Sequence, residues 1–454
     1  MRPYRWELKD KNLLMEIPDL YGSVFDCSCG TRHKICPEKV IYDREAVDAL
    51  PSVLAGFVNG TSVAVFEDER TKAVVGSEIV KKLQAAGWTV VEKVVPDTKK
   101  GQTPVCDDVT LTCLESETGR LDTVVAAGSG VISDLAKWFA YNRGIPYLCF
   151  ATAASMNGYA SANVAPTLQG IKSLIRAAPP KAVLASPDII RDAPWRMTAA
   201  GLGDLLAKSV SAADWYLNHF LFGDYYCEKA VNIIQEIEPY YLDQPAEVRN
   251  RLPETLEAMF HALLLTGVAM TMAETSSPSS GGEHMPSHAL DMLSALDGHP
   301  HDLHGRQVGI GTVLAAEVYY RLLQAEKPPP ARIPASVDKR YWGRLAETVE
   351  EHYKGKSERL QQLPQLLEQQ ELWEALRGKL SDVVRSPATV HACLVQAGAA
   401  STTADIGCSR ERIVGALNHG HEIRSRVTVL DLAQIFGILP EEGAEIVDMW
   451  AVAQ

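Results

Sequence analysis

The sequence has little of what would place it in a membrane or on a nucleic acid. Its N-terminal segment, MRPYRWELKDKNLL, lacks the apolar core of a secretory signal. We find no run of about 20 apolar residues that would span a bilayer. Positive charge is scarce: 44 lysines and arginines stand against 57 acidic residues, and the formal net charge is −13. Because phosphate backbones bind basic surfaces, we expect no nucleic-acid partner and no membrane span, although a small basic pocket for one phosphate is compatible with this charge.

Cysteine is present, but in an odd number. Nine cysteines without a secretory signal predict reduced thiols and a cytoplasmic location. The segment CSCGTRHKIC gathers Cys27, Cys29, His33 and Cys36. Its C-x-C and C-x-x-x-H spacings do not match a standard zinc knuckle, and no second half follows nearby. We therefore expect a buried or turn-forming segment here, with a structural zinc as the alternative.

The length argues for two domains. A chain of 454 residues is too long for a single core of ordinary size. The predicted secondary structure changes near 187–194. Strand-like and helix-like segments alternate before this point, and only helix-like segments follow it, including a charged region at 337–384. We therefore expect an N-terminal domain over 1–190 and a helical domain over 191–454.

The first half has the pattern of an α/β domain. Apolar strand-like runs lie at 62–68, 89–95, 122–130 and 146–155, and helix-like segments lie at 73–87 and 131–144. Apolar strands that alternate with helices indicate a parallel sheet covered on both faces.

One strand-to-helix junction, AAGSGVISDLAK, has the composition of a phosphate-binding loop. Glycines allow a tight turn, and a helix N-terminus offers unpaired amides with partial positive charge. The residues that would offer these amides are Gly130, Val131, Ile132, Ser133 and Asp134. The dinucleotide fingerprint would need a glycine in place of Ser133, and the Gly-Lys-Ser/Thr of a P-loop is missing. A tight turn in which Ser133 or Asp134 caps the helix is an equal alternative.

An acid follows an early strand of this half. Asp68 in FEDERT occupies the position from which a carboxylate binds ribose hydroxyls in nucleotide-binding sheets. A carboxylate there also repels a 2′-phosphate, which favours NAD over NADP. A surface acid in an acid-rich loop is the alternative interpretation.

The helical half carries polar residues that apolar helices do not need. Asp204 and Lys208 in GLGDLLAK share one helix face. His284 and His288 follow a loop of small residues, and His304 lies further on. One carboxylate and two imidazoles can bind a divalent metal and leave a position open for substrate. Each histidine alone is more often a polar residue with an ordinary hydrogen-bond partner than a metal ligand.

A proline separates the first two histidines. Pro286 suits the first turn of a helix. We therefore expect His284 to precede the helix that carries His288, and the two histidines to have different roles.

Six motifs together resemble a known family. They are GSGVISDLAK, TAASMNGYAS, GLGDLLAKSVSAADW, SSPSSGGEHMPSHALD, LHGRQVGIGT and IRSRVTVLDLAQIFG. Their order resembles that of the bacterial and archaeal sn-glycerol-1-phosphate dehydrogenases, which are relatives of glycerol dehydrogenase, iron-containing alcohol dehydrogenases and dehydroquinate synthase. With Asp68 they span 68–437, nearly the whole chain. Any one motif is modest evidence, but six in order are hard to reach by chance.

The resemblance implies a fold and a set of site residues. The fold is a dehydroquinate synthase-like one, with a Rossmann-like NAD(P)-binding α/β domain, an all-α C-terminal domain and the active site in the cleft between them. A divalent metal, Zn²⁺ or in some bacterial members Ni²⁺, would be held by Asp204, His284 and His304. Contacts to NAD(H) or NADP(H) match Asp68, Gly128, Gly130, Val131, Ile132, Ser133, Asp134, Thr152, Ala153, Ala154, Ser155 and Ser161. Substrate contacts match Asn157, Asp204 and His288.

The resemblance also implies a reaction on a small phosphorylated substrate. Hydride would pass reversibly between the nicotinamide and dihydroxyacetone phosphate, giving sn-glycerol 1-phosphate, and the metal would act as a Lewis acid. Catalytic roles fall to Asp204 and to His288, which would relay a proton, bind the substrate or orient a metal ligand. Lys208 would bind phosphate or pair with Asp204. The segment 419–426, HGHEIRSR, adds positive charge or surface ion pairs. Relatives are often homodimers, so we expect one here.

Some residues depart from the family pattern. Asn157 stands where family members usually have aspartate, and an amide has lost the charge while gaining a donor. Val427 stands where an aromatic residue is common. Extra residues precede His304 and bring in His299 and His301 as competing metal ligands.

Three other functions are compatible with the sequence. Asn157 suggests a dehydrogenase of a non-phosphorylated polyol or other alcohol. A lyase of the dehydroquinate synthase kind would regenerate its NAD and consume no NADH overall. A non-catalytic relative would keep the fold and bind a nucleotide or a partner without bound metal.

Overall fold

The computed structural model describes residues 13–98, 103–168, 171–328, 330–332 and 336–452. Residues 1–12, which make up most of the N-terminal segment MRPYRWELKDKNLL considered above, lie outside the described residues. The chain divides into two compact units. Unit 1 comprises 1–201 and 232–274, and unit 2 comprises 202–231 and 275–454.

Unit 1 is built on a parallel sheet of six strands. The strands are ordered β3 (Lys39–Tyr42), β12 (Ala182–Ala185), β7 (Tyr147–Ala151), β6 (Thr123–Gly128), β4 (Ser62–Glu67) and β5 (Thr89–Val94). All neighbouring strands run parallel, with registers such as Val65↔Val125 and Ala126↔Cys149. The parallel α/β sheet predicted from the apolar runs is therefore confirmed.

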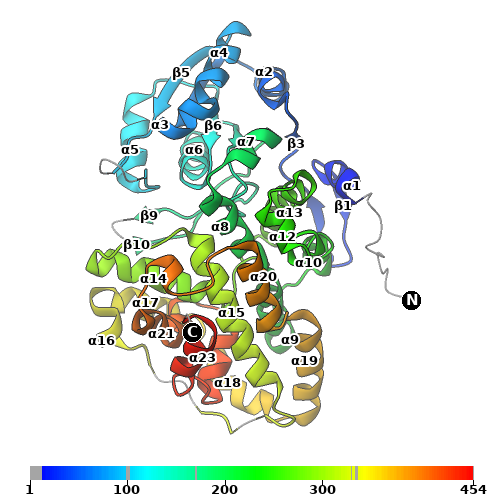
Figure 1. Ribbon diagram of the computed structural model, residues 1–454, viewed down its shortest axis with the longest axis vertical. Coiled ribbons are helices and arrows are strands. Elements are labelled where there is room, and N and C mark those ends of the chain that lie inside the picture. The colour runs from blue at the N-terminus through cyan, green and yellow to red at the C-terminus, as the bar shows by residue number, and fades with distance from the viewer. Residues whose placement is uncertain (1–12, 99–102, 169–170, 329, 333–335, 453–454) are drawn as a thin grey trace. The chain divides into compact units, whose positions relative to one another are not determined.

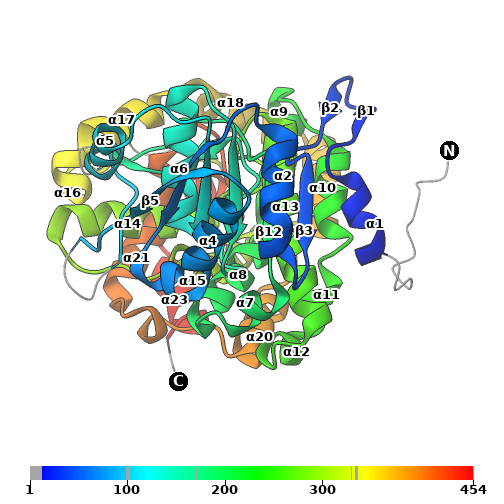
Figure 2. The ribbon, with the colours of Figure 1, turned by 90° about the horizontal axis from the view of Figure 1, so that it is seen from above.

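Helices cover both faces of this sheet. Side chains of successive strand residues point to opposite faces. On one face, Val63 and Val65 join a buried cluster with α2 (Ala46–Phe57) and α4 (Ser77–Ala85), which lie side by side in Figure 2. On the other face, Phe66 meets Phe139 of α6 (Gly130–Arg143) edge to face, with ring centroids 5.0 Å apart. Burial on both faces explains why these strands are continuous apolar runs.

The helix predicted at 73–87 is preceded by other helical turns. A short α3 (Glu69–Thr71) and a π-helical turn η1 (Lys72–Gly76) come before α4. A Cβ on Gly76 would stand 1.6 Å from Oε2 of Glu67, so this turn can wrap around the buried carboxylate only where the residue is glycine. A residue contact of this kind leaves no periodic signal in the sequence.

Unit 1 also contains small elements around the sheet. Two-stranded antiparallel pairs are formed by β1 (Val24–Asp26) with β2 (Arg32–Lys34), β8 (Asn163–Val164) with β11 (Ile175–Arg176), and β9 (Thr167–Leu168) with β10 (Ile171–Lys172). Its further helices are α1 (Leu13–Leu20), α5 (Asp108–Glu117), α7 (Pro187–Asp192), α11 (Pro239–Leu242), α12 (Pro245–Arg249) and α13 (Pro253–Ala273). Two helices run across the unit boundaries, α8 (Trp195–Leu206) and α10 (Glu228–Gln235).

The long helix α13 is the core helix of this unit. By length and composition it could cross a membrane, contrary to the sequence-based expectation, but 89% of its apolar window is buried inside the protein. Its Phe260 packs on Tyr42 with ring centroids 5.1 Å apart, and its His261 bonds to the Tyr21 hydroxyl at 3.0 Å. A buried core helix passes the same membrane test, so this helix is weak evidence for a span.

The sequence-based division at residue 190 assigns α13 to the second domain. The structure instead places 232–274 in unit 1, because α13 packs on residues near the start of the chain.

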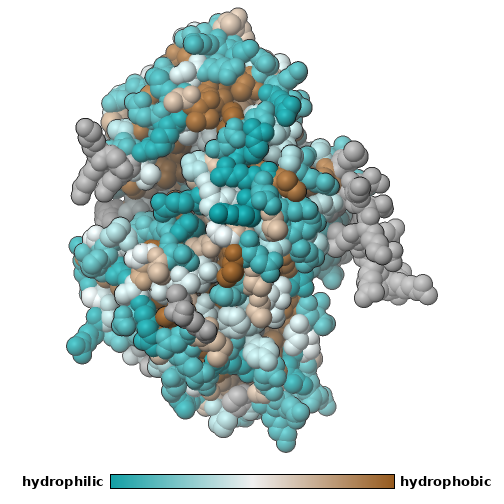
Figure 3. Space-filling view, in the orientation of Figure 1, coloured by the Kyte–Doolittle hydropathy of each residue, from teal (hydrophilic) through white to brown (hydrophobic). Residues whose placement is uncertain are grey.

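Every regular element that the structure describes within unit 2 is a helix. Beside the end of α8, they are α9 (Lys208–Phe222), α14 (His284–Asp297), α15 (His304–Leu323), α16 (Lys339–Trp342), α17 (Ala346–Lys354), α18 (Ser357–Leu367), α19 (Gln370–Val383), α20 (Pro387–Ala397), α21 (Arg410–His419), α22 (Val429–Ile435) and α23 (Gly443–Trp450), with short 3₁₀ turns η2 (Gly343–Leu345), η3 (Ala404–Ile406) and η4 (Gly420–Ile423) (Figure 1). The predicted all-α C-terminal part is confirmed. Hydrophilic residues cover most of the face seen in Figure 3, with apolar residues between them.

Candidate metal centre and nucleotide-binding loop

Three predicted ligands meet inside unit 2. Asp204 lies near the end of α8, and His284 and His304 are the first residues of α14 and α15. One ligand atom from each lies within 4.8 Å of the others, and Nε2 of His284 is 3.5 Å from Oδ1 of Asp204. Asp204 and His284 are almost wholly buried, at 1% and 3% exposure. One carboxylate and two imidazoles at this spacing are a donor set for a divalent cation with one position left open.

Glycines bring these three residues close together. A Cβ on Gly203 would stand 2.1 Å from the carbonyl oxygen of Gly305, so α8 and α15 touch backbone to backbone beside Asp204 and His304. A Cβ on Gly311 would stand 2.3 Å from the carbonyl oxygen of Glu283. The glycine spacing of HGRQVGIG therefore places the start of α14 and the end of α8 against α15.

Hydrogen bonds orient both imidazoles. Nδ1 of His284 pairs with Oε1 of Glu283 at 2.7 Å, and Nδ1 of His304 pairs with Oγ of Ser287 at 3.2 Å. A partner on one ring nitrogen fixes the tautomer and leaves the other nitrogen for a metal. Glu283 is held in turn by the amide of Gly281, which donates to it at 2.8 Å. The donor set and its supporting bonds thus fit a divalent cation.

The carboxylate of Asp204 has a strong cationic neighbour. Lys208 Nζ donates to Oδ1 of Asp204 at 3.2 Å, and also to the carbonyl and hydroxyl oxygens of Ser279 at 2.9 and 3.2 Å. Burial alone would raise the pKa of Asp204, but the charge of Lys208 and the bond to His284 outweigh it and lower that pKa. The three protons of Lys208 are engaged by Asp204 and Ser279, so the structure shows the pairing with Asp204, and binding of phosphate by Lys208 stays a prediction.

The proline between the histidines has a simpler effect than predicted. Helix α14 begins at His284 and carries Pro286 in its first turn, where an amide would have no helical partner. The prediction that His284 precedes the helix is therefore wrong, because His284 is its first residue. His284 and His288 are four residues apart in α14 and lie on the same helix face. The ring centroid of His288 is 5.9 Å from the ring centroid of His284 and 5.4 Å from that of His304.

His288 has a partner that sequence reasoning missed. Nη2 of Arg424 lies 3.1 Å from Nε2 of His288. A guanidinium only donates, so this ring nitrogen accepts. Arg424 is half-buried and forms no ion pair with any described residue, and desolvation together with the charge of Arg426 lowers its pKa to about 9. The sequence left the HGHEIRSR segment open between added positive charge and surface ion pairs, and in the structure its first arginine, Arg424, bonds to His288.

The competing histidines stand apart from this set. His299 is exposed, and His301 pairs with Asp291 at 3.2 Å. His288, Asp291 and His304 form a second group whose ligand atoms lie within 4.8 Å of one another, but it is more exposed than the Asp204 set. The buried set with Asp204 is the better metal centre, because its imidazoles are already oriented.

Asp214 supports the site without having been singled out. Its carboxylate accepts from the amides of Gly282 and Val429 at 2.6 and 2.9 Å, and from the hydroxyl of Tyr319 at 2.5 Å. Burial and the nearby Glu283 raise its pKa to about 7. The sequence signal was an acid inside the apolar helix SAADWYL, because a buried carboxylate is costly unless hydrogen bonds or charges stabilise it.

The predicted phosphate loop lies in unit 1. Gly128 ends β6 and Gly130 begins α6, with Ser129 as the N-cap. A Cβ on Gly128 would stand 2.7 Å from Cβ of Ile132, so this turn needs glycine. The amide of Ser133 already donates to the carbonyl of Ser129 at 2.9 Å, which leaves the amides of Gly130, Val131 and Ile132 at the helix start.

Two predicted details of this loop are corrected. The Ser133 hydroxyl bonds to the Tyr147 hydroxyl at 3.1 Å, and a carboxylate oxygen of Asp134 accepts from the amide of Ala165 at 3.2 Å. Neither side chain caps α6, because the N-cap is Ser129.

A buried lysine fastens the following loop. Lys137 of α6 donates to the carbonyls of Gly158 and Asn163 at 2.6 and 3.2 Å and to the Ser161 hydroxyl at 3.3 Å. Burial lowers its pKa. These bonds shape the loop that carries Thr152, Ala153, Ala154, Ser155, Asn157 and Ser161. A lysine inside an apolar helix was the sequence signal for this role.

Asp68 takes the place predicted for it at the end of β4. It is the N-cap of α3, and its Oδ1 accepts from the amides of Arg70 and Thr71, each at 2.8 Å. Its Oδ2 lies 3.6 Å from Nη1 of Arg70. The contact with ribose hydroxyls stays a prediction.

Comparison with known proteins identifies the relatives of this chain. Residues 41–194 match the family of iron-containing alcohol dehydrogenases. A glycerol-1-phosphate dehydrogenase of Bacillus licheniformis is 33% identical over 304 residues, which are 66% of this chain and 75% of the relative. That of Thermococcus kodakarensis is 33% identical over 62% of this chain and 78% of its own length. That of Bacillus velezensis is 28% identical over 91% and 95%.

Solved structures share the fold. A glycerol dehydrogenase from Schizosaccharomyces pombe superposes with a TM-score of 0.57 at 14% identity, over 90% of both chains. A 1,3-propanediol oxidoreductase also gives 0.57, at 15% identity over 90% of this chain and 97% of its own. These structural similarities establish the fold, and the relatives at 33% sequence identity establish the family. The chain belongs to the NAD(P)-dependent glycerol-1-phosphate dehydrogenase family.

Proposed function

We propose that this chain is a metal-dependent, NAD(P)H-linked oxidoreductase that interconverts dihydroxyacetone phosphate and sn-glycerol 1-phosphate. The relatives carry that activity in their names. Among the features of the chain itself, Arg424 carries the proposal: a half-buried guanidinium that forms no ion pair with any described residue is a site for an anion.

Asp204, His284 and His304 would hold the metal. When bound, a divalent cation supplies Lewis-acid polarisation of the substrate carbonyl. Nitrogen and carboxylate donors with an open position suit Zn²⁺, and Ni²⁺ is the alternative. Lys208 keeps Asp204 ionised and in place, and Glu283 keeps His284 turned toward it.

Arg424 and His288 would serve the substrate's two ends. The guanidinium of Arg424 binds the phosphate through charge-assisted hydrogen bonds. Once these hydrogens turn to the phosphate, Nε2 of His288 is released from its bond to Arg424 and can exchange a proton with the substrate oxygen. Arg426 would support the site, because it donates to the hydroxyls of Ser277 and Ser276 and to the carbonyl of Ser280.

The test compares two ketones. NADH and NADPH oxidation is measured with dihydroxyacetone phosphate and with dihydroxyacetone, in the wild type and in Arg424→Leu. We expect a preference for the phosphate ester, and a rise of KM for it of about 100-fold in the variant, since a charged hydrogen bond contributes roughly 2–3 kcal/mol. Activity on dihydroxyacetone should change little. Arg410→Gln, which removes a surface ion pair with Asp448, is the control. Equal use of both ketones by the wild type would refute the proposal.

A non-phosphorylated alcohol is the second candidate. Asn157 favours it, because the amide has replaced the family carboxylate in the loop that Lys137 fastens. Under this alternative, the free polyol is the better substrate and Arg424→Leu leaves its kinetics unchanged.

Finer properties belong to the same proposal. The capping carboxylate of Asp68 supports a preference for NAD over NADP. A homodimer is carried over from the resemblance, and sedimentation of the purified protein tests it. A cytoplasmic location is proposed from the cysteine usage and the N-terminal composition, and microscopy of a tagged chain tests it. Metal analysis after purification distinguishes zinc from nickel.

A further inference from the structure

A second set of metal-ligating side chains lies in the N-terminal hairpin of unit 1. Strands β1 and β2 pair over only three residues each, Val24↔Lys34, Phe25↔His33 and Asp26↔Arg32. Between them, the turn is closed by bonds from the amide of Cys27 to the carbonyl of Thr31 and from the amide of Gly30 to the carbonyl of Cys27, both 3.0 Å. Gly30 has φ +85°, which favours glycine there.

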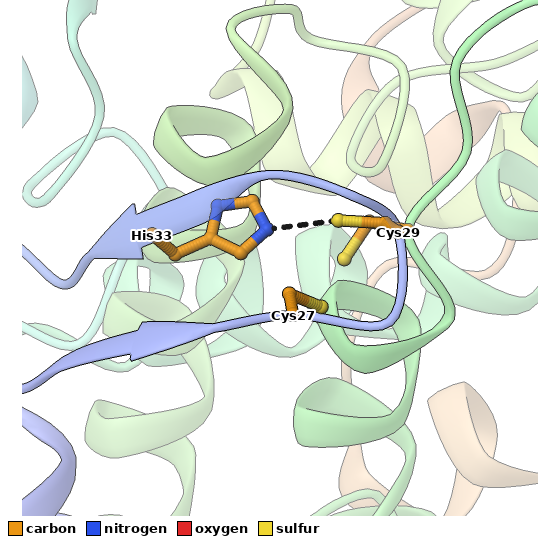
Figure 4. A group of neighbouring side chains, drawn as sticks. Cys27, Cys29 and His33 are labelled. Carbon is orange, nitrogen blue, oxygen red and sulfur yellow. Dashed lines mark hydrogen bonds between the residues drawn. The ribbon is translucent and has the colours of Figure 1, made fainter.

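This turn points two thiols and one imidazole at each other. The Sγ atoms of Cys27 and Cys29 and a ring nitrogen of His33 lie within 4.8 Å of one another. Sγ of Cys29 is 3.2 Å from Nε2 of His33, as Figure 4 shows. Ligand atoms around one tetrahedral Zn²⁺ stand about 3.5–3.8 Å apart, given Zn–S near 2.3 Å and Zn–N near 2.0 Å. The three side chains therefore already lie at ligand spacing.

The surroundings favour a metal over an incidental contact. His33 is only 3% exposed although it lies on a short surface hairpin, and its ring packs on Phe25 with centroids 5.7 Å apart. A two-stranded hairpin of this length is marginal without further support. The cysteines form no disulfide. The sequence left a structural zinc here only as the alternative, because its spacing is not a standard one and His33 reaches the thiols through the strand pairing.

We propose that Cys27, Cys29 and His33 bind a structural zinc ion that clasps the N-terminal hairpin. Two soft thiolates and an imidazole select Zn²⁺ over Mg²⁺ or Ca²⁺. The fourth position takes a further thiolate or a water. This ion is separate from the metal at Asp204, whose donors are nitrogen and oxygen, and the proposal does not depend on the enzymatic activity. The clasp would hold the segment from Gly22 to Ile35, whose ends are joined by a 3.2 Å bond between the Gly22 amide and the Ile35 carbonyl.

Metal content of the full chain tests the proposal. Zinc per chain is measured for the wild type, for the double variant Cys27→Ser/Cys29→Ser, and for Cys36→Ser as a matched control, because Cys36 lies in the same segment but outside the cluster. We expect the double variant to lose one zinc per chain and the control to lose none. His284→Ala should lose the other metal while keeping the hairpin zinc, so failure of one site is distinguishable from failure of the other.

Cobalt gives a signal that is specific for thiolate ligands. The protein loaded with Co²⁺ should show thiolate-to-metal charge-transfer absorption in the wild type, in Cys36→Ser and in His284→Ala, and not in the double variant. Cys29→His, which replaces a thiolate by an imidazole, should retain the ion with weaker absorption, and this separates loss of a ligand from loss of the hairpin. Equal zinc in the wild type and the double variant, or a Cys27–Cys29 disulfide in the reduced, zinc-supplemented wild type, would overturn the proposal.

Discussion

His284 links the metal centre to its support through both ring nitrogens. One nitrogen faces Asp204 and the other is held by Glu283. We expect His284→Ala to release the metal and to lower the rate of NADH oxidation by on the order of a thousandfold, because Lewis-acid stabilisation is worth several kcal/mol. Nucleotide binding should survive, since the phosphate loop belongs to unit 1. Metal analysis and nucleotide titration measure the two effects.

The control for this variant is a histidine that competes in sequence but not in space. His301→Ala removes the bond to Asp291 and should leave metal content unchanged. If His301→Ala released as much metal as His284→Ala, or if His284→Ala also abolished nucleotide binding, the assignment of His284 as a ligand would be wrong.

Asn157 stands where the family resemblance implies an aspartate. We expect Asn157→Asp to raise kcat/KM for dihydroxyacetone phosphate by about tenfold, the effect of one hydrogen bond to a charged group. Steady-state kinetics with both ketones measure it. No change, or a lower value, would mean that this side chain does not limit the reaction.

At the scale of elements, the last residue of β4, Glu67, has a buried carboxyl group. Glu67 is inaccessible to solvent, and burial together with the charge of Glu92 raises its pKa to about 8, while Lys72 holds Glu92 ionised. A carboxyl group whose pKa is raised on folding stabilises the fold below its unfolded value near 4.5 and loses this contribution as the pH rises through about 8.

The pH dependence of unfolding tests this account. Relative to Glu67→Gln, the wild type should lose free energy of unfolding between pH 4.5 and 8, by at most about 1.4 kcal/mol per pH unit. Urea titrations at several pH values measure the difference, and Glu78→Gln on the exposed side of α4 is the control. Parallel pH curves for the wild type and Glu67→Gln would contradict the raised pKa.

Sequence patterns predicted elements well where the buried residues follow a regular pattern, either one face of a helix or every residue of a central strand. The strands at 62–68 and 122–130 are buried on both faces and read as apolar runs, and the helices around them follow. The same patterns gave no sign of the π-helical turn at 72–76 or of the short strands at 163–176, because these depend on single contacts such as that between Gly76 and Glu67.

The candidate site divides in the same way. The sequence pointed to Asp204, His284 and His304 because polar residues of these types are unusual in apolar helices. The family resemblance then implied that the three are ligands of one metal. Asp214 and Lys137 were missed because a charged residue on a helix is usually solvated, and only the fold shows that these two are buried. Arg424 was left open, because only the fold shows its bond to His288. Sequence spacing reports neighbours along the chain, whereas these contacts join distant segments.

At the scale of the whole molecule, the chain passes between its two units three times. Unit 1 needs both 1–201 and 232–274. We therefore expect a fragment of residues 1–190 to fail to fold, since Tyr21 and Tyr42 would lose their partners on α13. Circular dichroism and limited proteolysis of the fragment measure this, with the full chain as reference. A cooperative thermal transition in the fragment would show that α13 is dispensable.

This threading of the chain has a consequence for its synthesis. Domains usually fold in order as they leave the ribosome, N-terminal first. Here the sheet-bearing unit stays incomplete until residue 274 has emerged, and the segment 202–231, made earlier, has to wait for partners translated after it. For more than half of translation the nascent polypeptide therefore exposes unfinished surfaces of unit 1, and from residue 202 to residue 274 it exposes unfinished surfaces of both units, which lengthens the time during which chaperones can bind it.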